Sequence, residues 1–197
     1  MGEQPEGTSD FESFLADLSA RFTGLPGDRV NAEIESALRE LVEFLGTDRA
    51  TLFEFAGGEA AFLALARAHH ARCLADPELN HPFTHDDQHP QHVERLAAYW
   101  AEVMGGPPTY SQTCGDESGV LRMHAGNGDM GDLGERFLDC FVRALDDAEL
   151  PADPAFRAAL RAYMRWAVDN VLSYSSEDAV VPSRVGIPRW DWSGLQA

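Results

Sequence analysis

Histidine is the residue type best suited to chemistry in this sequence, and its distribution along the chain is uneven. All seven histidines lie between residues 69 and 124, and six of them lie between residues 69 and 92. An imidazole changes charge near neutral pH and is the commonest metal ligand in proteins. The histidine-rich part of the chain is therefore the first place to look for a metal site or a proton-transfer site.

A metal ion held directly by histidines is one interpretation of this distribution. His85, His89 and His92 have the close spacing of a zinc or copper site, but the segment around them is polar and is not predicted to be rigid. The other interpretation, which we favour, is that His81, His85 and His89 are solvated loop residues.

Other catalytic signatures are missing from the sequence. The three cysteines, Cys73, Cys114 and Cys140, contain no close pair, which indicates reduced thiols rather than a disulfide framework or a thiolate metal site. The acidic pairs lie in expected turns, where they are usually solvated. The sequence has no GK[ST] loop and no GxSxG, so nucleotide hydrolysis and serine hydrolysis lack their motifs. Its one GxGxxG match, residues 126–131, follows no predicted strand and therefore does not make a dinucleotide-binding fingerprint.

The charge of the chain excludes two classes of partner. Fifteen basic residues stand against 33 acidic residues, which gives a formal net charge of −18. A protein so acidic repels nucleic-acid phosphates and anionic membrane surfaces. No apolar run reaches the roughly 20 residues of a membrane span, and the acidic start of the chain does not resemble a signal peptide. We expect a cytoplasmic protein with no nucleic-acid or membrane partner.

The elements that must position the histidines are predicted to be helices, because apolar residues recur at helical spacing through most of the chain. Residues 50–55 are predicted to be strand or loop, residues 109–130 loop, and the aromatic segment 187–192 a tail that packs on the helices. The fold class is therefore all-α. The expected helices run from Ser9 to Phe22, from about Asp28 to Leu45, from Glu59 to Leu74, from Pro90 to Val103, from Leu133 to Leu145, and from Pro154, with Asp153 as its N-cap, to Val171.

A series of short fragments in a fixed order completes the sequence evidence. From about Phe53 to Tyr174 this order resembles the group II truncated globins. The resemblance implies a 2-over-2 helical sandwich that binds haem b. The fragments are Phe55-Ala56-Gly57-Gly58, Leu74-Ala75-Asp76-Pro77-Glu78-Leu79, His81-Pro82-Phe83, Arg95-Leu96-Ala97, Gly105-Gly106-Pro107, Tyr110-Ser111 and Leu121-Arg122-Met123-His124.

The resemblance also implies a role for each matching residue. His124 is implied to be the proximal ligand of the iron, and a neutral imidazole nitrogen suits that role. Distal donors stabilise a dioxygen ligand, and basic side chains pair with carboxylates such as the haem propionates. The remaining implied residues are Phe83 packed on the porphyrin, His70, His92 and Leu96 lining the distal side, Arg95 and Arg122 beside the propionates, and Phe137 as a haem contact.

Four features depart from the family pattern, so ligand affinity is not carried over from it. The motif before the proximal histidine is Arg-Met-His instead of Arg-Met-Arg-His. The aromatic residue common three positions after that histidine is replaced by Asn127. Phe137 stands where tryptophan is common, and His70 stands where many members have tyrosine.

The chain is expected to divide into three parts. Residues 1–52 form a helical extension in which Leu18 to Phe55 resembles the opening helices of a GAF-type sensory domain, without the sheet that forms its pocket. Residues 53–175 form the globin domain, and residues 176–197 form a tail packed on it. The amphipathic helices of the extension must bury their apolar faces on the globin or on a second copy, so a homodimer is one expected arrangement.

The function expected from the resemblance is reversible binding of a diatomic gas, namely dioxygen, nitric oxide or carbon monoxide, for storage, delivery or sensing. The alternative is redox chemistry at the same iron, such as nitric oxide dioxygenation or peroxidase-like turnover. Sustained turnover needs a reductase, because the chain has no flavin or nicotinamide motif. A third interpretation is a scaffold that has kept the fold without haem.

Overall fold

The computed structural model describes residues 6–30, 33, 34, 36, 37, 40, 41, 50–84 and 89–196. The chain forms two compact units, residues 1–49 and residues 50–197. Each unit is described separately below.

The first unit contains helix α1 (Glu6–Phe22) and the short 3-10 turn η1 (Gly27–Arg29). The helix begins three residues before Ser9, so the capping pattern of Ser9 does not mark its start. The described residues between Val30 and Leu41 are helical, whereas the rest of the helix expected from Asp28 to Leu45 lies outside the described residues. The Arg21 guanidinium pairs with the carboxylates of Glu33 and Glu40.

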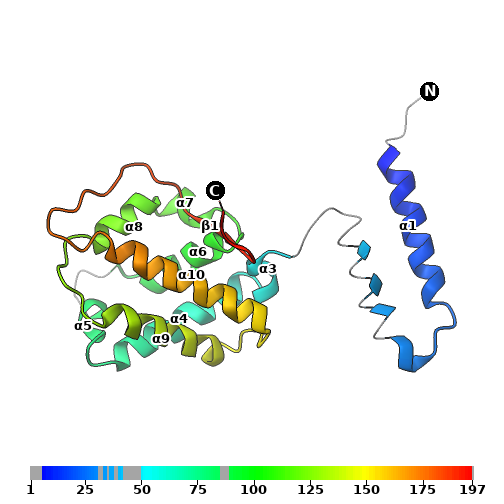
Figure 1. Ribbon diagram of the computed structural model, residues 1–197, viewed down its shortest axis with the longest axis horizontal. Coiled ribbons are helices and arrows are strands. Elements are labelled where there is room, and N and C mark those ends of the chain that lie inside the picture. Colours follow the sequence, from blue (N-terminus) through cyan, green and yellow to red (C-terminus); the bar gives the residue numbers. More distant parts are fainter. Residues whose placement is uncertain are drawn as a thin grey trace. The chain divides into compact units, whose positions relative to one another are not determined.

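The second unit is built from helices that pack in two layers (Figure 1). Its helices are α3 (Leu52–Ala56), α4 (Glu59–Ala75), α5 (Asn80–Phe83), α6 (His92–Val103), α7 (Thr109–Thr113), α8 (Glu117–His124), α9 (Leu133–Asp147) and α10 (Pro154–Leu172).

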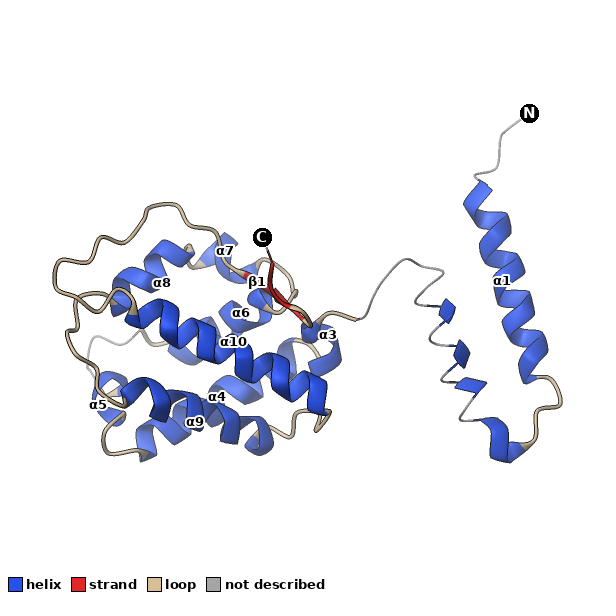
Figure 2. Cartoon of the chain, viewed as in Figure 1, coloured by secondary structure: helices blue, strands red, loops and turns tan. Residues whose placement is uncertain are grey.

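The core of this unit lies where four long helices meet. Helix α4 packs against α6 and α9, and α9 packs against α10, so the α4–α6 pair covers the α9–α10 pair (Figure 2). Burying large apolar side chains at such an interface is the main stabilising term of a helical fold. The predicted all-α sandwich is therefore confirmed. The side chains that fill its centre include Phe62, Leu65, Leu138, Phe141, Leu160 and Tyr163, each at most 1% exposed.

The expected strand or loop at residues 50–55 is wrong, because this segment forms helix α3. The Thr51 hydroxyl accepts a hydrogen bond from Glu54 N, and the Glu54 carboxylate accepts one from Thr51 N, both at 3.1 Å. This reciprocal pair is a capping box, whose Thr-x-x-Glu signature was present in the sequence. Leu52 then becomes fully buried in the core.

The expected loop over residues 109–130 is also wrong in part, because it contains α7 and α8. Helix α8 begins directly after its N-cap Asp116, whose carboxylate accepts a hydrogen bond from Gly119 N at 2.9 Å. Helix α6 starts at His92 instead of Pro90, which lies in the preceding turn. The expected N-cap Asp153 is confirmed, since its carboxylate accepts from Phe156 N at 2.8 Å.

The chain beyond α10 ends in a small antiparallel hairpin of β1 (Arg189–Asp191) and β2 (Gly194–Gln196), which the sequence did not predict. Trp190 is buried, with its ring centroid 5.7 Å from that of Tyr163 on α10. The indole of Trp192 donates a hydrogen bond to the carbonyl of Ala50 at 2.7 Å. The hairpin thus packs on the helices of the second unit.

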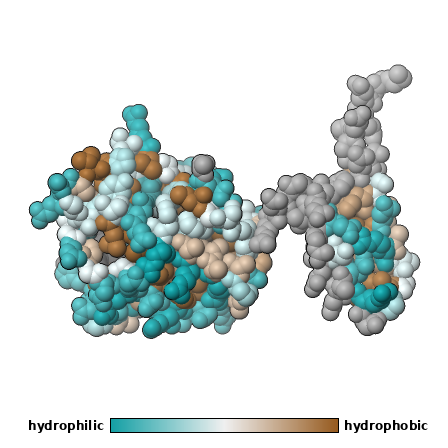
Figure 3. All heavy atoms as spheres, viewed as in Figure 1, coloured by the Kyte–Doolittle hydropathy of each residue, from teal (hydrophilic) through white to brown (hydrophobic). Residues whose placement is uncertain are grey.

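The face of the second unit drawn in Figure 3 is largely hydrophilic, with separate hydrophobic patches. None of the described helices combines the length and the apolar character that crossing a membrane requires.

Candidate functional site

Three of the residues singled out in the sequence meet at one place in the second unit. His70 on α4, Phe83 at the end of α5 and His92 at the start of α6 form a ring cluster. The centroid of the His70 ring lies 5.5 Å from those of Phe83 and His92, and the Phe83 and His92 centroids are 6.1 Å apart. Three helices therefore bring together side chains that are up to 22 residues apart in sequence.

Both histidines of this cluster have a buried nitrogen without a partner. The Nε2 atoms of His70 and His92 are buried and have no hydrogen-bond partner among the residues that the structure describes. A buried polar atom left unpaired costs about 1–3 kcal/mol, so such atoms are rare and point to an additional ligand. Burial, together with the neighbouring His70, lowers the pKa of His92, which favours the neutral imidazole.

His124 ends helix α8, and its ring has a defined orientation. Its Nδ1 lies 2.8 Å from the carbonyl oxygen of Val120, one turn earlier in the same helix. Because a carbonyl can only accept, Nδ1 carries the proton, and the lone pair of the neutral ring is on Nε2. The ring is solvent-exposed and close enough to His92 to lower the pKa of that residue by charge repulsion.

His69, the neighbour of His70, faces a different environment. It is fully buried, with its ring centroid 4.4 Å from that of Phe137 and 5.4 Å from that of Trp100. Burial lowers its pKa to about 4, so the ring is neutral at physiological pH. The half-buried Phe137 touches this aromatic group and also packs against the small cluster of Cys73, Leu79 and Cys140.

The remaining expected residues lie on the same helices. Leu96, one turn after His92, is half-buried and packs on the main core. Arg95 turns inward, and its Nη2 donates a hydrogen bond to the carbonyl of Cys114 at 3.3 Å. Arg122 on α8 is more exposed and lies 3.8 Å from the carboxylate of Asp116.

The structure contains two buried carboxylates that the sequence analysis did not predict. Glu117, at the start of α8, accepts a hydrogen bond from the Tyr99 hydroxyl at 2.7 Å, and burial raises its pKa. Glu102 accepts one from Ser111 N at 2.9 Å. A single sequence gives no signal for either contact, because the partners lie on other elements.

The alternative metal site has no counterpart in the described part of the chain. No group of three or more histidine, cysteine, aspartate or glutamate side chains there is arranged to hold a metal ion. His81 and His89 are exposed, and His85 lies outside the described residues.

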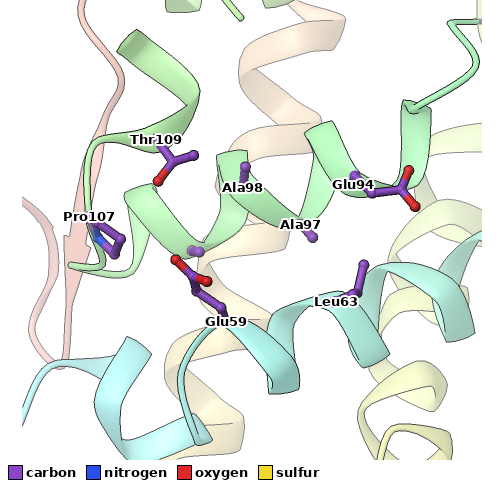
Figure 4. Close-up of a pocket in the computed structure, with 8 residues that line it drawn as sticks. Glu59, Leu63, Glu94, Ala97, Ala98, Pro107 and Thr109 are labelled. Atoms are coloured by element: carbon purple, nitrogen blue, oxygen red, sulfur yellow. The ribbon is translucent and has the colours of Figure 1, made fainter. Parts of the chain in front are cut away.

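A separate pocket of about 190 Å³ lies between α4 and α6 (Figure 4). Its floor is formed by alanines of α6, and Glu59, Leu63 and Glu94 stand around it. None of the three residues of the ring cluster lines this pocket, so the two sites are distinct.

The model of the bacterial-like globins matches residues 51–172. This chain belongs to the bacterial-like globin family. The match begins within one residue of the second compact unit and ends at the last residue of α10. The globin fold is thus carried by that unit, whereas the resemblance of the first unit to a GAF domain is not supported. A search of curated proteins finds no match.

Several solved globins share this fold. A thermostable haemoglobin from the actinobacterium Thermobifida fusca is 29% identical, with a TM-score of 0.52, and the alignment covers 68% of this chain and 100% of that one. A haemoglobin from Chloroflexus aurantiacus is also 29% identical, with a TM-score of 0.52 and coverage of 62% and 98%. The group II 2-on-2 haemoglobin of Agrobacterium tumefaciens is 25% identical, with a TM-score of 0.53 and coverage of 64% and 95%.

These similarities confirm the resemblance to truncated globins and support haem binding by this chain. The residues present fit such a group. The two unpartnered Nε2 atoms of His70 and His92 are available to an added group, and the contact of His124 Nδ1 with the Val120 carbonyl leaves Nε2 free to bind a metal.

Proposed function

We propose that this globin binds haem b between α6 and α8 and reversibly binds dioxygen, or a related diatomic gas, for storage, delivery or sensing. The observation that carries the proposal is the pair of buried Nε2 atoms of His70 and His92 that have no partner among the described residues, with His124 close enough to His92 to lower its pKa. The haem would supply an iron with one coordination position open to the gas.

His124 is the residue that would hold the iron. The hydrogen bond from its Nδ1–H to the Val120 carbonyl fixes the tautomer and the ring orientation. This bond also makes Nε2 more basic, and therefore a better ligand for the iron. Phe83 and Leu96 would pack on the macrocycle. Phe137 would lie behind these side chains, because its ring contacts the fully buried His69 and packs against the main core.

The distal histidines would act on the gas ligand. A neutral imidazole has one N–H donor, and the lowered pKa of His92 keeps the ring in that state. We favour His92 over His70 as the main donor, because it stands at the start of α6 and interacts electrostatically with His124 across the site.

Arg95 and Arg122 differ in how available they would be to a haem propionate. Arg95 already donates inward to the Cys114 carbonyl. Arg122 has a side chain that is 56% exposed and only a distant contact with Asp116. Arg122 is therefore the stronger partner for a haem propionate.

The test is to add haem to the purified protein and compare the parent with His124→Ala and with His81→Ala, an exposed histidine on the same unit. We expect His124→Ala to lose tight haem binding, with the Soret band restored by added imidazole, because one coordinate bond anchors the iron. His81→Ala should match the parent. An unchanged Soret band and unchanged axial ligation in His124→Ala would contradict the proximal assignment. Failure of the parent to take up haem would contradict the proposal as a whole.

A further inference from the structure

Helix α8 has only eight residues, so it needs support from outside itself. Helices much shorter than about 12 residues are marginal in water. The first turn is capped by Asp116, but the residue after His124 is extended Ala125, which supplies no left-handed cap. The last turn also packs little, because Arg122, Met123 and His124 are all exposed.

The first turn of α8 is tied to the chain beyond α10 by two hydrogen bonds. Glu117 N donates to the carbonyl of Val185 at 3.1 Å, and Val185 N donates to the hydroxyl of Ser118 at 2.8 Å. Ser118 is fully buried and Val185 is half-buried, so this contact is partly shielded from water. Both hydrogen bonds involve Val185, so together they fix the position of the tail along helix α8.

The segment that follows α8 is tied to the same tail by a second pair of bonds. Gly126 N donates to the carbonyl of Tyr174 at 3.0 Å, and Gly128 N donates to that of Ser175 at 2.8 Å. Both glycines have a φ of 73°, a conformation that other residues rarely adopt. Tyr174 and Ser175 are themselves held by hydrogen bonds to the last turn of α10.

Residues 174–185 therefore form a strap that holds both ends of α8, and Figure 1 shows this orange to red segment running from α10 past α8. The strap lies beyond the residues that the globin family model matches, which end at 172.

We propose that the strap is a positioning element for His124, and that Ser118 is the residue through which it acts on the first turn of α8. This inference rests on the proposed role of His124. Among the described residues, the hydrogen bond given for the ring of His124 is the one to Val120 within α8 itself, so the position of the ring follows the position of the helix. Releasing one end of α8 would let the imidazole shift and weaken the hold on haem.

The test compares Ser118→Ala, which removes the acceptor for Val185 N, with Ser183→Ala, an exposed serine of the same strap. Three quantities are measured in the full chain: the rate of haem transfer to an excess of another apo-globin, the iron–histidine stretching band of the ferrous protein, and hydrogen–deuterium exchange of residues 119–124 in the haem-free protein.

We expect Ser118→Ala to release haem about three to ten times faster, the change that losing one hydrogen bond produces. Its iron–histidine band should shift or broaden, and exchange in α8 should accelerate even without haem. Ser183→Ala should match the parent. If Ser118→Ala does not fold, Val185→Pro removes the same bond from the side of the strap, with the exposed Val180→Pro as its control.

The inference is overturned if Ser118→Ala or Val185→Pro behaves like its control in all three measurements. That outcome is distinct from failure of the proposed function. If His124→Ala loses haem while the strap variants do not differ from their controls, only the positioning role is wrong. If His124→Ala keeps its axial ligation, the proximal assignment itself is wrong.

Discussion

Replacing His92 by leucine is the most direct probe of the distal site. The substitution removes the N–H donor but keeps a side chain of moderate volume, so the packing against His70 and Phe83 is largely retained. The lowered pKa of His92 means that the parent ring is neutral and offers one donor to the gas ligand. The variant therefore isolates that single hydrogen bond.

The size of the effect follows from the environment of the ring. A hydrogen bond from a buried donor to a ligand that gains negative charge is worth about 1–3 kcal/mol. Since about 1.4 kcal/mol corresponds to a factor of ten, dioxygen should dissociate roughly 5 to 150 times faster from His92→Leu. His70→Leu should give a smaller increase. The stability of the haem-free protein should not fall, because leucine removes a buried nitrogen that has no partner among the described residues.

The assay is rapid-mixing displacement of dioxygen by carbon monoxide, recorded beside the ferrous spectrum of the parent, with the exposed His81→Leu as the control. Direct coordination of the iron by His92 would give a different result. The parent would then be six-coordinate, and His92→Leu would bind gas faster. If neither leucine variant changes the dissociation rate and the parent is five-coordinate, the distal assignment of both histidines is wrong.

Three further predictions concern folding and stability. Removing residues 1–49 should leave a folded protein with a normal Soret band, because the second unit has its own core; loss of haem uptake in the soluble truncated protein would contradict this. Burial raises the pKa of Glu117, so the folded state binds its proton more tightly than the unfolded state, and the free energy of unfolding is reduced as pH rises between the unfolded and folded pKa values. Glu117→Gln removes this loss, so thermal unfolding of the haem-free protein should show the variant gaining stability relative to the parent as the pH rises above the ordinary pKa range of a glutamate; parallel curves would refute the assignment. Gly106→Ala should cost about 1–3 kcal/mol in chemical denaturation, because its Cβ would lie 2.7 Å from a backbone oxygen and 2.8 Å from the ring of Phe53, whereas Gly186→Ala, with no atom within 4 Å, should be neutral.

The order of the helices and the family could be predicted from the sequence because both depend on local patterns. Apolar residues at helical spacing marked α9 and α10, and Asp153 with Pro154 marked the start of α10. Short helices were missed where the signal is only a cap and a few residues, as at α3 and α8. A helix of two turns has too few apolar positions to show a period.

What only the tertiary structure decided is which residues face one another. Neighbouring residues on a helix point about 100° apart, so His69 and His70 must face different surroundings, but the sequence of α4 does not say which side chains of other elements each ring meets. The packing of α9 answers this, because Phe137 meets His69, while His70 meets Phe83 and His92. The burial of Glu117 and the strap over α8 depend on contacts between residues far apart in the chain. The sequence by itself determined the helices, the family and the residue types available for haem, whereas side-chain partners became visible only when distant elements packed together.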